Sequence, residues 1–226
     1  MVHVDRLVVS LFQSNCFIVR NGDDRRALVI DPGDNAPDIS AFIERNQLTV
    51  AAYLLTHGHV DHVYGLAAMV SRFPAPVAMH PDDAKWAFTE RAAFPPYYGA
   101  PAAPPSIDRS LAEGQAWTDI GLTYRIMHTP GHSPGGMVFY FAQEKILFGG
   151  DNLFRGSIGR SDLPGANPAV LADSLRKMME LPDDVTVYCG HGDETTIGRE
   201  RKSNPFLRSF DWAENEGATD SGFADH

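Results

Sequence analysis

The most constraining feature of this sequence is a cluster of metal-binding side chains between residues 57 and 62. His57, His59 and His62 each offer an imidazole nitrogen, and Asp61 offers a carboxylate. These are the donors that zinc, iron and similar divalent ions prefer in proteins. A single histidine is usually an ordinary packed or surface residue, but this density of donors predicts a metal site. The fold must therefore bring this segment to a place where an ion can bind.

The surroundings of the cluster indicate where it sits. Residues 50–55 form a short apolar run typical of a buried strand, and Thr56 ends the run. Alternation along an extended segment points His57 and His59 the same way, whereas Asp61 and His62 stand at the start of a helix suggested by residues 64–70. One cluster can thus face two neighbouring metal positions.

Further donors follow three later strand-like runs, each with glycines beside the donor. The runs at 122–127, 145–148 and 185–189 lead to His132, Asp151 and His191 respectively. Glycine allows close approach of the backbone to a bound group. Ligands in α/β architectures are commonly held in loops beyond the carboxyl ends of strands. The sequence therefore predicts that these loops meet.

The H-x-H-x-D-H cluster, the three later donors and their glycine flanks resemble the metallo-β-lactamase superfamily of metal-dependent hydrolases. The similarity extends from residues 15–19 to residues 204–207. Residues 150–154, 159–165 and 195–205 resemble the glyoxalase II (hydroxyacylglutathione hydrolase) group, which hydrolyses glutathione thioesters such as S-lactoylglutathione. The resemblance implies an α/β (α+β) fold, a four-layer αββα sandwich of two mixed β-sheets.

The resemblance also implies a ligand set and two divalent metal ions, with zinc expected and iron or manganese as alternatives. One ion would be held by His57, His59 and His132, the other by Asp61, His62 and His191, and Asp151 would bridge both. Asp61 has an implied catalytic role as well, because it would orient the attacking hydroxide and accept its proton.

Such a site predicts hydrolysis by a metal-bridging hydroxide, since bound divalent ions lower the pKa of water from about 15.7 to about 7. A thioester suits this chemistry, because a free thiol has a pKa of about 8.5 and leaves with little protonation. Serine catalysis is disfavoured, because Ser133 lies beside His132 and no Gly-x-Ser-x-Gly motif is present. Cys16 and Cys189 lie in apolar runs typical of buried cysteines.

Two alternative functions stay open at this point. One is another hydrolase of the same superfamily, such as a lactonase or a β-lactamase. The other is a persulfide dioxygenase with a single iron held by His57, His132 and Asp151. The loop at residues 157–165 resembles the hydrolases more closely, so we expect a thioesterase.

The candidates for substrate binding are Arg160, Tyr97 and Tyr98. Arg160 is expected first to pair with Asp162, and the two tyrosines lie in the proline-rich segment 94–105, which is either a rigid connector or an aromatic loop over the pocket mouth. Outside the ligand set, Pro81 and the acids after it predict that His80 begins a helix. Asp31 is expected to support the metal loops.

Composition supports a compact enzyme with a small-molecule substrate. The chain has 226 residues, 43% of them hydrophobic, and its donors spread from 57 to 191, so we expect one domain over 1–212 and a flexible tail at 213–226. The tail lacks the basic helical region that binds glutathione in full-length glyoxalase II enzymes, so the thiol half of the substrate is open.

The charge balance and the apolar patterning limit the partners and the compartment. The net charge of −10 argues against the basic surface that a nucleic-acid-binding protein needs. The two cysteines in apolar contexts, and the lack of a long apolar segment or signal peptide, predict a cytoplasmic protein that does not bind membranes. The sequence does not indicate an oligomeric state.

Beyond the apolar runs named above, the hydrophobic patterning predicts a strand at 137–142 and helices at 38–46, 81–91 and 168–180.

Overall fold

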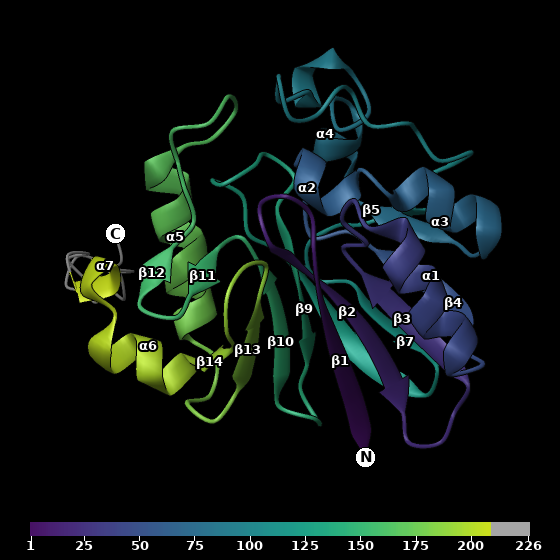
Figure 1. Ribbon diagram of the computed structural model, residues 1–226. Coiled ribbons are helices and arrows are strands. Elements are labelled where there is room, and N and C mark those ends of the chain that lie inside the picture. Colours follow the sequence, from purple (N-terminus) through teal and green to yellow (C-terminus); the bar gives the residue numbers. More distant parts are fainter. Residues whose placement is uncertain (209–226) are drawn as a thin grey trace, which may run out of the picture.

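The computed structural model describes residues 1–208, and it contains two six-stranded β-sheets packed face to face with helices outside both (Figure 1). This arrangement confirms the predicted αββα sandwich of two mixed sheets. The predicted tail at 213–226, with the last residues of the predicted domain, lies outside the described residues.

The first sheet has the strand order β1-β2-β3-β4-β5-β6. Its first three strands pair antiparallel, whereas β3, β4, β5 and β6 pair parallel. The predicted strand at 50–55 is β4. Helices α1 (Ala36–Arg45) and α3 (Leu66–Arg72) pack on the outer face of this sheet. The strands are β1 Val2–Val9, β2 Ser14–Asn21, β3 Arg26–Ile30, β4 Thr49–Leu54, β5 Val77–Met79 and β6 Arg109–Ser110.

The second sheet has the order β14-β13-β10-β9-β8-β7, with β10 and β13 parallel and the other neighbours antiparallel. The predicted strands from residue 122 onward are confirmed within two residues at each end. Helices α5 (Pro168–Met179), α6 (Ile197–Ser203) and α7 (Pro205–Arg208) lie outside it. The strands are β7 Ala116–Asp119, β8 Leu122–His128, β9 Met137–Phe141, β10 Ile146–Gly150, β13 Thr186–Cys189 and β14 Thr195–Thr196, with a separate hairpin of β11 Leu153–Phe154 and β12 Ser157–Ile158.

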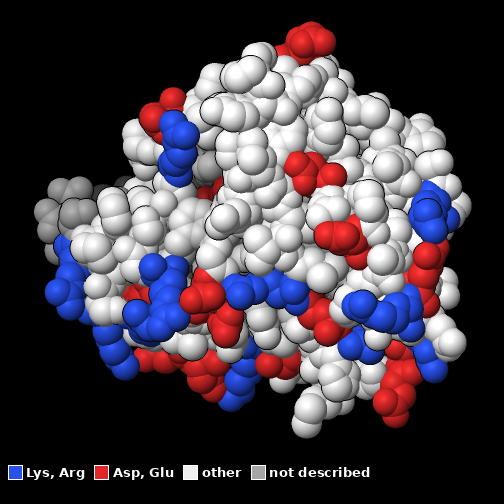
Figure 2. Space-filling view, viewed as in Figure 1, with Lys and Arg blue, Asp and Glu red and all other residues white. Residues whose placement is uncertain are grey.

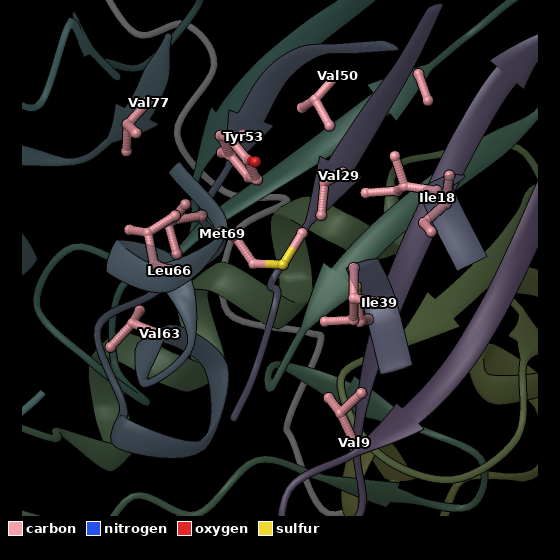
Figure 3. Packing of buried hydrophobic residues seen from close by; sticks show 14 of the residues in the cluster. Val9, Ile18, Val29, Ile39, Val50, Tyr53, Val63, Leu66, Met69 and Val77 are labelled. Carbon is pink, nitrogen blue, oxygen red and sulfur yellow. The ribbon is translucent and has the colours of Figure 1, made fainter. Parts of the chain in front are cut away.

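Three apolar clusters fill the three interfaces between the four layers. Neighbouring residues of a strand point to opposite faces, so Ile18 packs toward the helices while Phe17 and Val19 pack between the sheets. Both faces of the central strands are buried, which explains their continuous apolar runs. Figure 3 shows the cluster between the first sheet and its helices, where Ile18, Val29, Ile39, Tyr53, Leu66 and Met69 converge.

The helix at 168–180 is confirmed, and its start follows from local chemistry. The Asn167 side chain accepts hydrogen bonds from the backbone N–H groups of Ala169 and Val170, and Pro168 needs no such partner. The predicted helix at 38–46 is α1, which begins two residues earlier because Asn35 caps it and Pro37 lies in its first turn.

The continuous helix expected after the metal cluster is wrong. Helix α2 covers only Val60–Val63, and α3 begins at Leu66. The Gly65 N–H donates to the carbonyl oxygen of Gly33, and a Cβ at Gly65 would lie 2.9 Å from that oxygen. Close packing against this neighbouring loop interrupts the helix, so Asp61 and His62 lie on a separate single turn.

The helix expected at 81–91 is also wrong in its length. Helix α4 covers Pro81–Ala84, and a 3-10 turn covers Glu90–Ala92. Thr89 separates them, because its hydroxyl donates to the Trp86 carbonyl and accepts from the Arg91 N–H. The predicted role of His80 is confirmed, since its Nδ1 accepts from the Asp82 N–H at the start of α4. In the part of the chain that is described, every helix is too short or too polar to cross a bilayer.

Candidate metal centre

The seven predicted ligands lie together at one end of the sandwich, above the carboxyl ends of strands from both sheets (Figure 1). His57 and His59 lie on the loop after β4, and Asp61 and His62 on α2. The other three follow β8, β10 and β13, in that order: His132, Asp151 and His191. The structure therefore joins donors that are up to 134 positions apart in the sequence.

The first group of donors is His57, His59 and His132, whose ligand nitrogens lie within 4.8 Å of one another. The Nδ1 atom of His59 is 2.8 Å from Nε2 of His132. Nε2 of His57 is buried and has no hydrogen-bond partner among the described residues. An unpartnered buried nitrogen is costly unless something binds it. These three nitrogens fit the coordination of one divalent ion.

The second group of donors is Asp61, His62 and His191, also within 4.8 Å of one another. Nε2 of His191 is 3.2 Å from Oδ2 of Asp61 and 3.4 Å from Nε2 of His62. This group mixes a carboxylate with imidazoles, a set that suits zinc, iron or manganese.

Asp151 lies between the two groups. Its Oδ2 atom is 3.6 Å from Nε2 of His132 in the first group and 3.3 Å from Nε2 of His191 in the second. Its Oδ1 atom is 3.5 Å from Nε2 of His62 but has no hydrogen-bond partner in the described chain. Gly190 makes this position possible, because a Cβ there would lie 2.0 Å from Oδ1. The Asp151 carboxylate can therefore contact ions in both groups.

Backbone carbonyls orient two of the histidines. Nδ1 of His132 is 2.8 Å from the Arg160 carbonyl oxygen, and Nδ1 of His191 is 3.1 Å from the Phe12 carbonyl oxygen. A carbonyl oxygen can only accept, so both Nδ1 atoms carry the proton of the neutral ring. Each Nε2 atom is thus left with a lone pair directed at the site, the arrangement that metal-binding histidines need.

Asp31 orients two more histidines, which confirms the predicted support of the metal loops. Its carboxylate accepts from the Thr56 N–H at 2.8 Å, from the Thr56 hydroxyl at 2.5 Å and from Nδ1 of His62 at 3.1 Å. Because the Thr56 hydroxyl donates to Asp31, it accepts from Nδ1 of His57 at 3.0 Å. His57 and His62 therefore also direct Nε2 lone pairs into the site.

Sequence reasoning missed the part played by Asp83. This fully buried carboxylate accepts from the Gly58 N–H at 2.8 Å, the Ser133 hydroxyl at 2.7 Å and the Gly135 N–H at 2.6 Å. It thereby ties the loop of His57 and His59 to the loop of His132. The sequence explains an acid here by the helix dipole alone, and no local pattern shows that this side chain points inward.

The two groups differ in their electrostatics. Burial alone would lower the pKa of His62 and His191, but Asp61 and Asp151 outweigh it and raise these values to about 9 and about 11. Burial and the neighbouring His132 lower the pKa of His59 to about 3, and burial holds the pKa of His57 well below its ordinary range. Within residues 1–208, the ion-pair partners of Asp61 and Asp151 are histidines and not lysines or arginines. These buried carboxylates therefore create a demand for positive charge, and two divalent ions fit that demand.

The site opens into a cavity of about 500 Å³. This volume is within the range of small-molecule sites. The donors His59, Asp61, His132, Asp151 and His191 form part of its lining. Its remaining walls are largely apolar, with two arginines, and include Phe12, Trp86, Arg91, Phe94, Phe154, Arg160, Leu163 and Pro164.

The predicted substrate-binding candidates differ in position. Arg160 lines the cavity, and it also forms the expected pair with Asp162 through two hydrogen bonds of 3.0 Å. Tyr97 and Tyr98 are not among the residues that line the cavity: Tyr97 packs against Phe12, and the Tyr98 hydroxyl donates to the Asp34 carboxylate and accepts from the Leu11 N–H. Phe94, from the same proline-rich segment, reaches the cavity instead. Phe12 also lines it, and no sequence signal pointed to that residue.

The nucleophile candidates that the sequence disfavoured have structural roles. The Ser133 hydroxyl donates to Asp83, so it is not poised to attack a substrate. Cys16 and Cys189 are buried, as expected, and burial raises the pKa of Cys189 to about 12. His128, four residues before His132, donates from Nε2 to the Pro134 carbonyl and so supports the same loop.

Comparison with known proteins agrees with this geometry. The model of the metallo-beta-lactamase superfamily matches residues 9–191, the span that holds all seven donors. The hydroxyacylglutathione hydrolase GloC of Haemophilus influenzae is 35% identical over 215 residues, which cover 92% of this chain and 99% of that protein.

Two solved structures are similar over nearly the whole chain. TTHA1623, solved in a di-iron-bound form, is 39% identical with a TM-score of 0.82, covering 90% of this chain and 100% of that one. BLEG-1, described as a B3 metallo-beta-lactamase, is 36% identical with a TM-score of 0.85, covering 91% of this chain and 99% of that one. The similarity therefore extends over about nine tenths of this chain.

Proposed function

Because this chain belongs to the metallo-β-lactamase superfamily, we propose that it is a dinuclear metal-dependent thioesterase acting on S-lactoylglutathione or a related thiol ester. The observation that carries the proposal is the placement of the seven donors. Two groups of three flank the Asp151 carboxylate, and the cavity of about 500 Å³ reaches both groups.

The donor set supports two ions rather than one. His57, His59 and His132 would hold the first ion, Asp61, His62 and His191 would hold the second, and Asp151 would contact both. When bound, divalent ions lower the pKa of water from about 15.7 to about 7 and stabilise negative charge on a carbonyl oxygen. Zinc, iron and manganese all suit these donors.

Asp61 is the residue to which we assign proton transfer. It lines the cavity and is 8% exposed. Burial alone would raise its pKa, but His62 and His191 outweigh burial and the pKa lies below its usual value. The carboxylate is therefore ionised at neutral pH, and it can orient a water molecule in the cavity and accept a proton from it. The thiolate that leaves needs little help from an acid, since its free pKa is about 8.5.

The relatives bear on the identity of the thiol. The match to the hydroxyacylglutathione hydrolase GloC spans 99% of that protein. GloC itself therefore has no additional domain beyond the region that matches this chain. This similarity supports a glutathione thioester as substrate.

One alternative has a specific observation in its favour. BLEG-1, whose structure is similar to that of this chain, is described as a B3 metallo-beta-lactamase, so hydrolysis of a β-lactam ring is the second candidate. The single-iron dioxygenase is a weaker candidate, because it would leave the complete second group of Asp61, His62 and His191 without a function.

Metal analysis of freshly purified protein, combined with three activity assays, tests the proposal. We expect about two ions per chain and release of free thiol from S-lactoylglutathione. Hydrolysis of nitrocefin with no thiol release would replace the thioesterase with a β-lactamase. One iron per chain, with oxygen uptake on glutathione persulfide, would instead establish the dioxygenase and refute the second metal position.

A further inference from the structure

The cavity contains two guanidinium groups, and they differ in whether a carboxylate neutralises them. The Arg160 side chain makes two hydrogen bonds with Asp162. The Arg91 guanidinium lies 5.9 Å from the ring of Trp86, and within residues 1–208 no carboxylate forms an ion pair with it. A cation stacked on an aromatic ring keeps its N–H groups free to bind an anion.

Arg91 lies close to residues that support the metal donors. The Trp86 ring beneath it donates a hydrogen bond to Asp83 and lies 5.5 Å from the His59 ring. Asp83 is the same buried carboxylate that holds the loops of His59 and His132. A continuous series of contacts therefore leads from the exposed Arg91 to the metal site.

The Arg91 side chain lines the same cavity as the metal donors. A Cβ built on Gly165, which follows the lining residues Leu163 and Pro164, would lie 3.2 Å from Nη2 of Arg91. The 3-10 turn that presents Arg91 is capped by Thr89. The free guanidinium thus lies between the Trp86 ring and the backbone at Gly165.

The charge of the rest of the molecule makes this cation important. The net charge is −10, which repels anionic molecules. On the face in Figure 2, most lysines and arginines lie over the lower half, and the upper half, where the metal loops lie in Figure 1, is largely uncharged with a few acids and a few basic side chains. With Asp61 and Asp151 occupied by metal ions, Arg91 is the one unpaired charge that the described residues place in the cavity.

We propose that Arg91 binds a carboxylate in the thiol half of the substrate. This assignment rests on the proposed thioesterase function and makes it more specific. The acyl carbon must lie at the metal donors, so the leaving thiol extends from them along the cavity that Arg91 lines. There the Arg91 guanidinium can form a charge-assisted hydrogen bond with a carboxylate. The enzyme would then select carboxylated thiols such as glutathione over neutral thiols.

Three thioesters separate the possible sources of the carboxylate. S-lactoylglutathione has it in the thiol half, S-succinyl-N-acetylcysteamine has it in the acyl half, and S-lactoyl-N-acetylcysteamine has none. In the metal-loaded Arg91→Met variant, we expect the KM for S-lactoylglutathione to rise about tenfold, the loss typical of one charge-assisted hydrogen bond. The kcat should change less than twofold, and both N-acetylcysteamine esters should be hydrolysed as by the wild type.

Two further variants provide controls. Arg91→Lys keeps the charge and should recover part of the loss. Arg45→Met removes an exposed arginine with a similar ring contact, 5.8 Å above Phe42 on α1, and should leave all three KM values unchanged. A loss confined to the succinyl ester would place the carboxylate site on the acyl half. Equal losses for all three esters, or no loss, would refute the assignment.

A binding measurement separates this assignment from the proposed function. S-hexylglutathione and its diethyl ester are titrated calorimetrically into metal-loaded wild type and Arg91→Met. We expect Arg91→Met to weaken binding of the carboxylated ligand about tenfold and to leave binding of the ester unchanged. If the wild type hydrolyses no thioester but shows this difference, the proposed function fails and the carboxylate site stands. If Arg91→Met binds both ligands as the wild type does, the carboxylate site fails even if the thioesterase is confirmed.

Discussion

The two groups of donors share one cavity but meet different physical requirements. The first group contains only imidazoles, and burial lowers the pKa of His57 and His59. The second group contains Asp61, and the carboxylates there raise the pKa of His62 and His191 above neutrality. The first position thus offers neutral lone pairs, whereas the second holds negative charge that requires a cation. Two neighbouring metal positions can therefore differ in affinity although they share Asp151.

The buried carboxylates that support the two groups of donors differ as well. Asp83 holds together the two loops that carry the first group. Asp31 contacts His62 of the second group directly and reaches His57 only through the Thr56 hydroxyl. Each group is thus oriented mainly by a different buried carboxylate, and the two can be perturbed separately.

The largest effect is expected from Asp151→Ala, because this change removes the carboxylate that lies between the two groups. Both ions should bind more weakly, and thioester hydrolysis should fall by about 10³-fold or more, the several kcal/mol that metal activation supplies. Elemental analysis and thiol release measure these effects, and circular dichroism checks that the fold is kept. Two retained ions with full turnover would show that Asp151 does not bridge.

A pair of variants tests whether the two positions are independent. His191→Ala removes a ligand of the second group only, and His59→Ala one of the first only. Each variant should retain about one ion per chain and lose about 100-fold in activity, because either ion alone supplies only part of the charge stabilisation. Elemental analysis gives the occupancy. Loss of both ions in both variants would contradict two separable positions.

The supporting carboxylates give a smaller and more selective effect. Asp31→Asn and Asp83→Asn each weaken hydrogen bonds around a ligand, and such changes typically lower metal affinity about 10- to 100-fold. Asparagine tolerates the φ of +49° at Asp31. We expect Asp31→Asn to weaken mainly the second ion and Asp83→Asn mainly the first.

Competition with a chelator, followed separately for each ion, measures the two affinities. The control is Asp38→Asn, which changes an exposed acid in the first turn of α1, far from both groups in sequence, and should leave both affinities unchanged. Identical loss profiles in Asp31→Asn and Asp83→Asn would remove the distinction between the two supports.

The smallest effect concerns the pH dependence of folding stability, at a histidine pair near the loop that carries His132 of the first group. His80 stacks on His128 with ring centroids 4.5 Å apart, at the base of the loop that carries His132. Burial and the neighbouring His128 lower the pKa of His80 below 6.5. The folded chain therefore binds fewer protons here than the unfolded chain, so this group makes folding less favourable as the pH falls below about 6.5.

The His80→Asn variant removes this titration and keeps a side chain that can begin α4. Its unfolding free energy should fall less than that of the wild type between pH 7 and pH 5, because asparagine does not titrate; linkage gives at most about 1.4 kcal/mol for each unit by which the pKa of His80 is lowered. Urea unfolding of both proteins at each pH gives the difference, with His3→Asn on β1 as the surface control. Identical pH dependence of all three proteins would exclude His80 as the cause.

Much of the fold could be predicted from local patterns. The continuous apolar runs indicate strands with both faces buried, and the asparagine and proline pairs at residues 35–37 and 167–168 explain where α1 and α5 begin. Prediction failed where distant contacts decide the backbone. The close approach of Gly65 to Gly33 interrupts one expected helix, and the two hydrogen bonds of Thr89 interrupt another.

The sequence by itself determined which side chains can bind metal and which strands carry them. A cluster of histidines and an aspartate within six residues is a local signal, and each later donor follows an apolar run with glycine beside it. Those patterns can be recognised in the sequence because side-chain chemistry and strand periodicity are local properties.

The family resemblance already implied how the donors divide into two groups, but only the tertiary structure decided which ring nitrogen each histidine presents and what supports it. These features depend on contacts between segments far apart in the chain, such as the Phe12 carbonyl at His191 and Asp83 at Gly58, Ser133 and Gly135. A buried polar group must find a partner, and the packing of the two sheets determines which groups are within reach. The free charge of Arg91 in the cavity follows from the same packing, and no pattern in the sequence distinguishes this residue from other arginines.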